Sequence, residues 1–194
     1  TRFNDGKCDP KGRFWAGSME DKETGKLIGS LYSLSDGVCT KHFGGIGVSN
    51  GIGWNSSADT MYYIDSPTRK VDAFDYDLTT GAVSNRRTVI NVPDGLGYPD
   101  GMSIDVNDKL WVCMWHGWAV IQFDPESGEI MQKLDVPVRN VTACAFAGPD
   151  LQELYITTSR HGNDDVGLDD QLDAGGLFHT RVNVQGTGFA RFAG

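Results

Sequence analysis

Three short polar segments have the residue types and the spacing to bind a cation together. They are Asn4-Asp5-Gly6, Ser49-Asn50-Gly51 and Pro99-Asp100-Gly101. Amide and carboxylate oxygens are ligands that hard divalent cations such as calcium accept. Asn-Gly and Asp-Gly are also common turn dipeptides, so each segment taken alone is more typical of a β-turn. The repetition along the chain makes a shared cation site an equal alternative.

A pair of apolar or aromatic residues follows each polar segment, and a fourth pair follows later. These pairs are Phe14-Trp15, Tyr62-Tyr63, Leu110-Trp111 and Leu154-Tyr155. From Trp15 to Tyr63 is 48 positions, from Tyr63 to Trp111 is 48, and from Trp111 to Tyr155 is 44. Repeats of this length with strand-like content indicate the blades of a β-propeller.

The repeat puts Asn4, Asn50 and Asp100 at equivalent places, at or just before the innermost strand of successive blades. Radial repetition carries equivalent positions to a common central axis, where their oxygens could share a cation. Arg2 lies in the same strand region as Asn4, and a guanidinium beside an amide could hold a substrate hydroxyl or carboxylate. A frayed terminus with a solvated Arg2 is the alternative.

A second strand with a central aromatic residue follows each pair, at residues 29–34, 70–76, 119–124 and 175–179. Short strands separated by Gly, Asp and Pro turns are typical of β-hairpins, and no segment has a long helical period. The sequence therefore predicts an all-β fold, a single β-propeller domain over residues 1–194 with about four blades. Propellers close with about four to eight blades, so four could form a small ring or an open arc. The unpaired edges of an arc would favour self-association.

Composition narrows the classes of partner. The net charge is −9 and no basic cluster is present, so neither nucleic acid nor an anionic membrane surface is an expected partner. No apolar run reaches the length of a membrane span. The four cysteines are widely spaced and lack a C-x-x-C pair, which favours buried thiols in a reducing compartment and hence a cytoplasmic protein.

Two further sets of residues are weak site candidates. The acidic stretch at residues 163–173 lacks the alternation and the bidentate Glu of an EF-hand loop, so we interpret it as a solvated loop. The four histidines are scattered, without the spacing of a zinc enzyme.

Several longer segments together resemble a known family. Arg2-Phe3-Asn4-Asp5-Gly6-Lys7, Gly12-Arg13-Phe14-Trp15-Ala16-Gly17-Ser18-Met19 and Pro99-Asp100-Gly101-Met102 are similar to the regucalcin (senescence marker protein)/gluconolactonase/luciferin-regenerating enzyme family. The resemblance covers the whole chain and keeps the order of the segments. It implies a six-bladed propeller, one divalent cation (calcium or zinc) in the central channel, and hydrolysis of a small-molecule sugar lactone.

The resemblance also implies roles for individual residues. The family's metal-binding Asn before Gly and Asp before Gly carry over onto Asn50 and Asp100. Its substrate-contacting Arg and Asn carry over onto Arg2 and Asn4. Asp100 is also the candidate catalytic residue, which would orient or deprotonate the attacking water.

Two parts of the family pattern have no clear counterpart. A substrate-side acid follows the Gly-Ser-Met segment in relatives; here that position reads as Lys22, with Glu20, Asp21 and Glu23 around it, and the assignment stays open. The chain resembles the C-terminal two-thirds of the family, so two blades and a metal-binding Glu would precede it. We therefore expect a truncated lactonase with low activity as an isolated monomer.

Two other functions are alternatives to the lactonase. One is a non-catalytic calcium-binding propeller that serves as an interaction platform. The other is a hydrolase of a different ester-like substrate, because the loops over the channel would set the substrate class.

Overall fold

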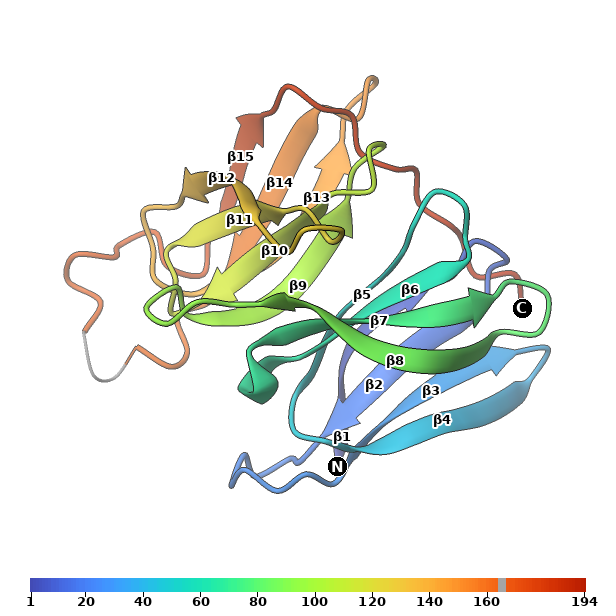
Figure 1. Ribbon diagram of the computed structural model, residues 1–194. Helices are drawn as coiled ribbons and strands as arrows, with labels where there is room; N and C mark the ends of the chain where they lie inside the picture. The colour runs from blue at the N-terminus through green and yellow to red at the C-terminus, as the bar shows by residue number, and fades with distance from the viewer. Residues whose placement is uncertain (164–166) are drawn as a thin grey trace. The chain divides into compact units, whose positions relative to one another are not determined.

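The protein is described by a computed structural model over residues 1–163 and 167–194, and the chain falls into two compact units. The first unit comprises residues 1–89 and 188–194, and the second comprises residues 90–187. Each unit contains two antiparallel sheets whose strands follow one another in chain order (Figure 1).

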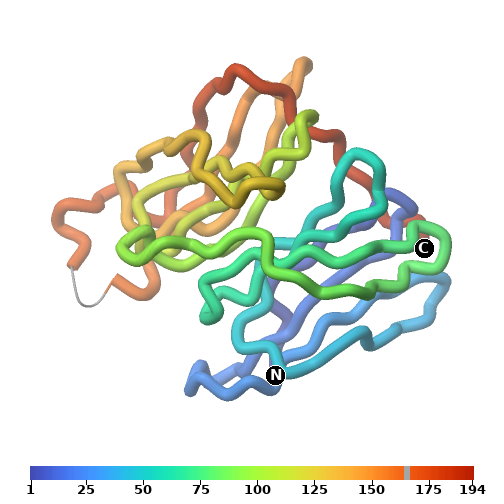
Figure 2. Tube along the Cα trace, in the orientation of Figure 1, coloured from blue at the N-terminus to red at the C-terminus, as the bar shows by residue number. Residues whose placement is uncertain are grey.

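The first unit has two four-stranded sheets. The first sheet contains β1 (Arg2–Cys8), β2 (Phe14–Met19), β3 (Gly29–Ser35) and β4 (Val38–Ile46). The second contains β5 (Ser49–Trp54), β6 (Thr60–Asp65), β7 (Lys70–Asp77) and β8 (Ala82–Asn91), with the 3-10 turn η1 (Ser66–Thr68) between β6 and β7. The C-terminal residues return to this unit (Figure 2), where Ala193 N donates to Gly12 O at 3.0 Å.

The second unit has one four-stranded and one three-stranded sheet. The first contains β9 (Tyr98–Ile104), β10 (Leu110–Trp115), β11 (Ala119–Phe123) and β12 (Ile130–Asp135). The other contains β13 (Val141–Ala147), β14 (Glu153–Thr158) and β15 (Leu177–Arg181). Within the described residues β15 is therefore an edge strand, and self-association through such an edge stays a prediction.

The strands confirm the predicted all-β, propeller-type fold. The four aromatic pairs lie on the second strand of successive sheets, and the four predicted strands after them correspond to the third strands. Four consecutive antiparallel meanders are the repeating element of a propeller. That residues 1–194 form a single domain stays a prediction.

Other sequence predictions had mixed outcomes. Asp164 and Asp165 of the acidic stretch lie outside the described residues, while the remaining aspartates of that stretch are exposed, as a solvated loop requires. The four cysteines form no disulfide; Cys113 and Cys144 are buried, but Cys8 is half-buried and Cys39 is exposed, so the prediction of buried thiols was wrong at those two positions. No helix in the described part of the chain is long and apolar enough to span a membrane.

An aromatic core lies between the two sheets of each unit. In the first unit Trp15 packs edge to face against Trp54 and Tyr76, with ring centroids 5.8 and 6.0 Å apart, and the tilted rings of Trp54 and Tyr76 lie 5.7 Å apart. In the second unit Trp111 packs against Phe146 at 5.8 Å. Trp15 and Trp111 come from the repeated aromatic pairs and are at most 1% exposed, so these pairs supply large buried rings to the two cores.

A fully buried aspartate closes the turn after β1 and the turn after β9, each of which is the first strand of its sheet. Asp9 and Asp105 are both 0% exposed. Asp9 Oδ2 accepts a hydrogen bond from Trp15 Nε1 at 3.2 Å, and Asp105 Oδ2 accepts one from Trp111 Nε1 at 2.9 Å. The other carboxylate oxygen of each aspartate accepts two backbone N–H groups of the turn that follows. The same device therefore joins the first and second strands in both units.

Asp9 carries a charge that its partners compensate. Burial alone would raise its pKa, but hydrogen bonds from Tyr76, Arg13 and Trp15 outweigh burial and hold the pKa below its ordinary value of 3.8. Arg13 Nη1 donates to Asp9 Oδ2 at 2.9 Å, so the buried carboxylate has a cationic partner. Removing one partner of a buried pair leaves the other uncompensated.

We predict that Asp9→Asn lowers the free energy of unfolding at neutral pH by about 3 kcal/mol. Because the native pKa is lowered, the stabilisation by Asp9 is complete above pH 3.8 and decreases as the pH falls below that value toward the native pKa. Denaturant unfolding at pH 7 and between pH 4 and 2.5 measures both effects. Asp21→Asn, which removes an exposed loop carboxylate, is the control, and equal stability of the two variants at pH 7 would contradict the prediction.

Candidate functional site

The first strand of every sheet carries a β-bulge where the repeat has its polar residue. The pairing with the second strand is interrupted at Asn4-Asp5 in β1 and at Gly51 in β5. It is interrupted at Asp100-Gly101 in β9 and at Thr142 in β13. A bulge adds one residue to a strand and redirects the side chain there. Asn4 and Asp100 lie in the interruption and Asn50 lies directly before it, so the predicted residues have similar places within their own sheets, inside the first strand.

The fourth bulge residue, Thr142, is one that the sequence reasoning missed. Its hydroxyl lies 2.7 Å from the hydroxyl of Thr157 on β14. The Thr142-Ala143 pair lacks the Asn-Gly or Asp-Gly signature, so the dipeptide search passed over it. Its distance of 42 positions from Asp100 (142 − 100) is the signal that could have found it.

Asn4 and Asn50 are brought together in the first unit, where β1 and β5 contact each other. Asn4 Nδ2 donates to Asn50 Oδ1 at 3.0 Å and to the backbone oxygen of Ser49 at 2.8 Å. Asn50 is 6% exposed, whereas Asn4 is exposed. The amide of exposed Asn4 therefore contacts the buried amide of Asn50, the residue predicted to be a metal ligand.

Arg2 joins the same group of side chains and is not a frayed, solvated residue. Its Nη1 donates to Asn4 Oδ1 at 3.0 Å, and its Nη2 donates to Glu23 Oε1 at 2.8 Å. Arg2 and Glu23 form an ion pair in which both side chains are about half exposed. The guanidinium is thus positioned by partners on two sides while part of it faces solvent.

The acidic residues around Lys22 have different surroundings. Glu20 is buried and accepts hydrogen bonds from the hydroxyl and backbone N–H of Thr24, both at 2.7 Å. The Thr24 hydroxyl is the main reason that the pKa of Glu20 is lowered. Glu20 therefore holds the loop between β2 and β3, and Glu23 is the acid that reaches Arg2.

Ser66 is a second residue that the sequence reasoning missed. Its Oγ accepts a hydrogen bond from Asn50 Nδ2 at 2.7 Å, and it is 9% exposed. It begins η1, directly after β6. A lone serine in a turn carries no sequence signal, so only the fold could show that it lies against Asn50.

Asp5, whose pKa is raised, lies next to this group of side chains. Burial raises the pKa of Asp5, although Lys7 and the backbone N–H of Gly6 act in the opposite direction. Asp5 Oδ1 accepts that N–H at 2.7 Å. Asp5 is part of the bulge in β1 and follows Asn4 directly, so a half-buried carboxyl lies in the same strand as Arg2 and Asn4.

Asp100 belongs to the second unit and is described there by itself. It lies in β9, half-buried, at the bulge of that strand. A Cβ on the following Gly101 would lie 2.8 Å from Thr142 O and 2.9 Å from Ala143 Cβ. Gly101 is therefore required for the close approach of β9 and β13, which accounts for the Asp-Gly pair.

The donors at the predicted ligand positions suit a hard cation. Asn50 offers an amide oxygen and Asp100 a carboxylate, which calcium and magnesium accept, whereas zinc favours nitrogen and sulfur ligands. Within the described residues, no group of three or more His, Cys, Asp or Glu side chains could hold a metal ion. Asn50 and Asp100 therefore have the chemistry of cation ligands, and they would form part of a larger ligand set.

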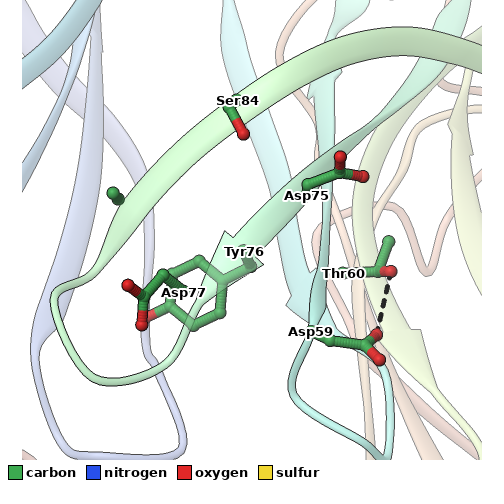
Figure 3. A pocket seen from close by; sticks show the side chains of 7 residues that line it. Asp59, Thr60, Asp75, Tyr76, Asp77 and Ser84 are labelled. Atoms are coloured by element: carbon green, nitrogen blue, oxygen red, sulfur yellow. Dashed lines mark hydrogen bonds between the residues drawn. The ribbon is translucent and has the colours of Figure 1, made fainter.

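An open pocket elsewhere in the first unit is acidic but is not a candidate site (Figure 3). Its carboxylates are already partnered: Asp75 pairs with Arg87 at 2.7 Å, Asp59 accepts the Thr60 hydroxyl at 3.1 Å, and Asp77 accepts a backbone N–H. None of the residues predicted to be functional lines it. Its lining consists of Asp59, Thr60, Asp75, Tyr76, Asp77, Ala82 and Ser84.

Comparison with known proteins shows relatives along the whole chain. The chain is 46% identical to regucalcin of Bos taurus over 192 residues, which is 96% of this chain and 64% of that protein. It spans about two thirds of the length of the curated relatives it matches.

Solved structures agree with this relationship. A luciferin-regenerating enzyme has a TM-score of 0.90 and 37% identity, over 98% of this chain and 64% of that one. A calcium-binding protein, regucalcin, from Agrobacterium tumefaciens has a TM-score of 0.91 and 28% identity over the same shares. The profile of the SMP-30/Gluconolactonase/LRE-like region matches residues 1–160. The chain therefore belongs to the SMP-30/gluconolactonase/LRE-like family.

Proposed function

We propose that the chain is part of a divalent-cation-dependent sugar lactone hydrolase. The observation that carries this proposal is the hydrogen-bonded set of Arg2, Asn4 and Asn50. It joins the two proposed substrate-binding side chains, Arg2 and Asn4, to the proposed metal ligand Asn50. Membership of a family that includes gluconolactonases supports the choice of substrate class. Because the relatives are longer, the activity proposed is that of the whole protein, to which this chain contributes these residues.

Asn50 and Asp100 are the proposed ligands, and calcium is the proposed cation because both ligands supply oxygen. When bound, the cation would polarise the lactone carbonyl. We pair these two residues because each lies in or directly beside the bulge of the first strand of its own sheet.

The remaining steps belong to the protein's own side chains. Arg2 and Asn4 bind substrate hydroxyl groups, and the guanidinium stabilises negative charge that develops on the carbonyl oxygen. Asp100 orients the attacking water and accepts its proton. The water oxygen bonds to the carbonyl carbon, the ring carbon–oxygen bond breaks, and the proton passes to the departing ring oxygen, which yields a hydroxy acid.

A calcium-binding protein without catalysis is the second candidate, favoured by one observation. A solved relative with a TM-score of 0.91 carries the description of a calcium-binding protein. Calcium binding without lactone hydrolysis would place the chain in that class. A hydrolase of a different ester-like substrate would use the same residues with a different substrate bound to them.

We predict that hydrolysis of gluconolactone by the whole protein requires calcium or zinc and stops with chelator. Asp100→Ala is expected to lower turnover by about 100-fold or more, the range for a lost general base. Acid release measured with each cation and with EDTA tests this. Asp77→Ala, which changes the acidic pocket in Figure 3, is the matched control and should retain activity. Turnover that is unaffected by chelator or by Asp100→Ala would overturn the proposal.

We predict that Arg2→Ala raises KM for the lactone about tenfold or more, because a charged hydrogen bond contributes about 1.5–3 kcal/mol. Glu23→Gln should raise KM only about threefold, since a half-exposed ion pair contributes at most about 1 kcal/mol. Steady-state kinetics of both variants provide the measurement. Arg87→Ala, which removes another exposed arginine of the first unit, is the control. A KM for Arg2→Ala that equals that of this control would exclude substrate binding by Arg2.

A further inference from the structure

The two ends of the Asn50 amide are chemically different, and only one of them can bind a cation. The oxygen can accept hydrogen bonds and coordinate a metal, whereas the NH₂ group can only donate. In the structure Oδ1 faces Asn4 Nδ2 at 3.0 Å, and Nδ2 faces Ser66 Oγ at 2.7 Å. The orientation of this buried amide therefore decides whether Asn50 can act as a ligand.

The orientation follows from the neighbours of Asn50. Arg2 can only donate, so Asn4 must present Oδ1 to it, and Asn4 then presents Nδ2 to Ser49 O and to Asn50. A reversed Asn50 amide would place its NH₂ against the NH₂ of Asn4. An unpaired buried donor costs about 1–3 kcal/mol, so the observed orientation is favoured by Asn4 on one side and by an acceptor for Nδ2 on the other.

Ser66 supplies that acceptor from a firmly held turn. The carboxylate of Asp65 accepts Val48 N at 2.9 Å and Gly47 N at 3.1 Å, and Ser66 N donates to Val48 O at 3.1 Å. Pro67 lies in the first turn of η1, where its fixed φ restricts the backbone further. The Ser66 hydroxyl therefore has a defined position relative to the start of β5.

We infer that Ser66 is a positioning residue, which holds the Asn50 amide so that its oxygen is the end available to a cation. This role deepens the proposed function, since it depends on Asn50 as a ligand. Residues that orient a ligand from behind typically change metal affinity by about 10- to 100-fold when they are replaced.

Two measurements on the full chain test the role of Ser66. The first needs no metal: the side-chain NH₂ signals of Asn50 in ¹⁵N NMR spectra should exchange slowly in the wild type and in Ser66→Thr, and rapidly in Ser66→Ala. The second is calcium affinity by calorimetry, which Ser66→Ala should weaken by about tenfold.

A double-mutant cycle separates orientation from a general loss of structure. Asp at position 50 has two equivalent oxygens and needs no orientation, so in an Asn50→Asp background Ser66→Ala should change calcium affinity by less than about twofold, unlike the response with Asn50. An equal loss of affinity in both backgrounds, or unchanged NH₂ exchange in Ser66→Ala, would overturn the inference. If the wild type binds no calcium while the NH₂ exchange still responds to Ser66→Ala, the proposed cation site fails and the orienting role of Ser66 stands.

Discussion

The hydrogen bond from a buried tryptophan to a buried aspartate is the interaction on which both units are built. Asp9 receives Trp15, and Asp105 receives Trp111, at the turn that joins the first two strands of a sheet. The carboxylate closes the turn with one oxygen and fixes the large ring of the core with the other. Without this contact the buried carboxylate would lose one of its hydrogen-bond donors, and the ring that fills the space between two sheets would lose its anchor. Turn geometry and core packing are thereby set by the same residue.

The β-bulges depend on these closed turns and on the packed aromatic core. A first strand that is anchored at its end by the turn and packed against its neighbour by aromatic residues has its register fixed, so an extra residue must be accommodated locally. In the first unit the extra residues fall where β1 contacts β5, and Asn4 consequently reaches Asn50. The contact between Asn4 and Asn50 is therefore a product of the strand register, to which a loop adds Glu23 and a turn adds Ser66.

Particular residues show what could be predicted from sequence. The aromatic pairs and the Asn-Gly and Asp-Gly dipeptides are local patterns, so they revealed the repeat, the strands and three of the four bulge positions. Thr142 has the position without the dipeptide, and Ser66 has no pattern at all, because its role arises from a contact 16 residues away in a different element. Glu20 and Glu23 could not be told apart either, since burial of one and the ion pair of the other depend on how the loop folds back.

The hydrogen bonds of the first unit have one direction, and this would couple the binding of the substrate to the binding of the cation. Arg2 donates to Asn4, Asn4 donates to Asn50, and Asn50 donates to Ser66, so every amide turns its oxygen toward Arg2. Asn50 Oδ1 has two lone pairs, of which Asn4 uses one. A cation on the other lone pair would compete with Asn4 for the same electron density. A substrate that hydrogen-bonds to Asn4 and a cation that binds Asn50 would therefore alter each other's affinity. Linkage requires the affinity for each to change by the same factor.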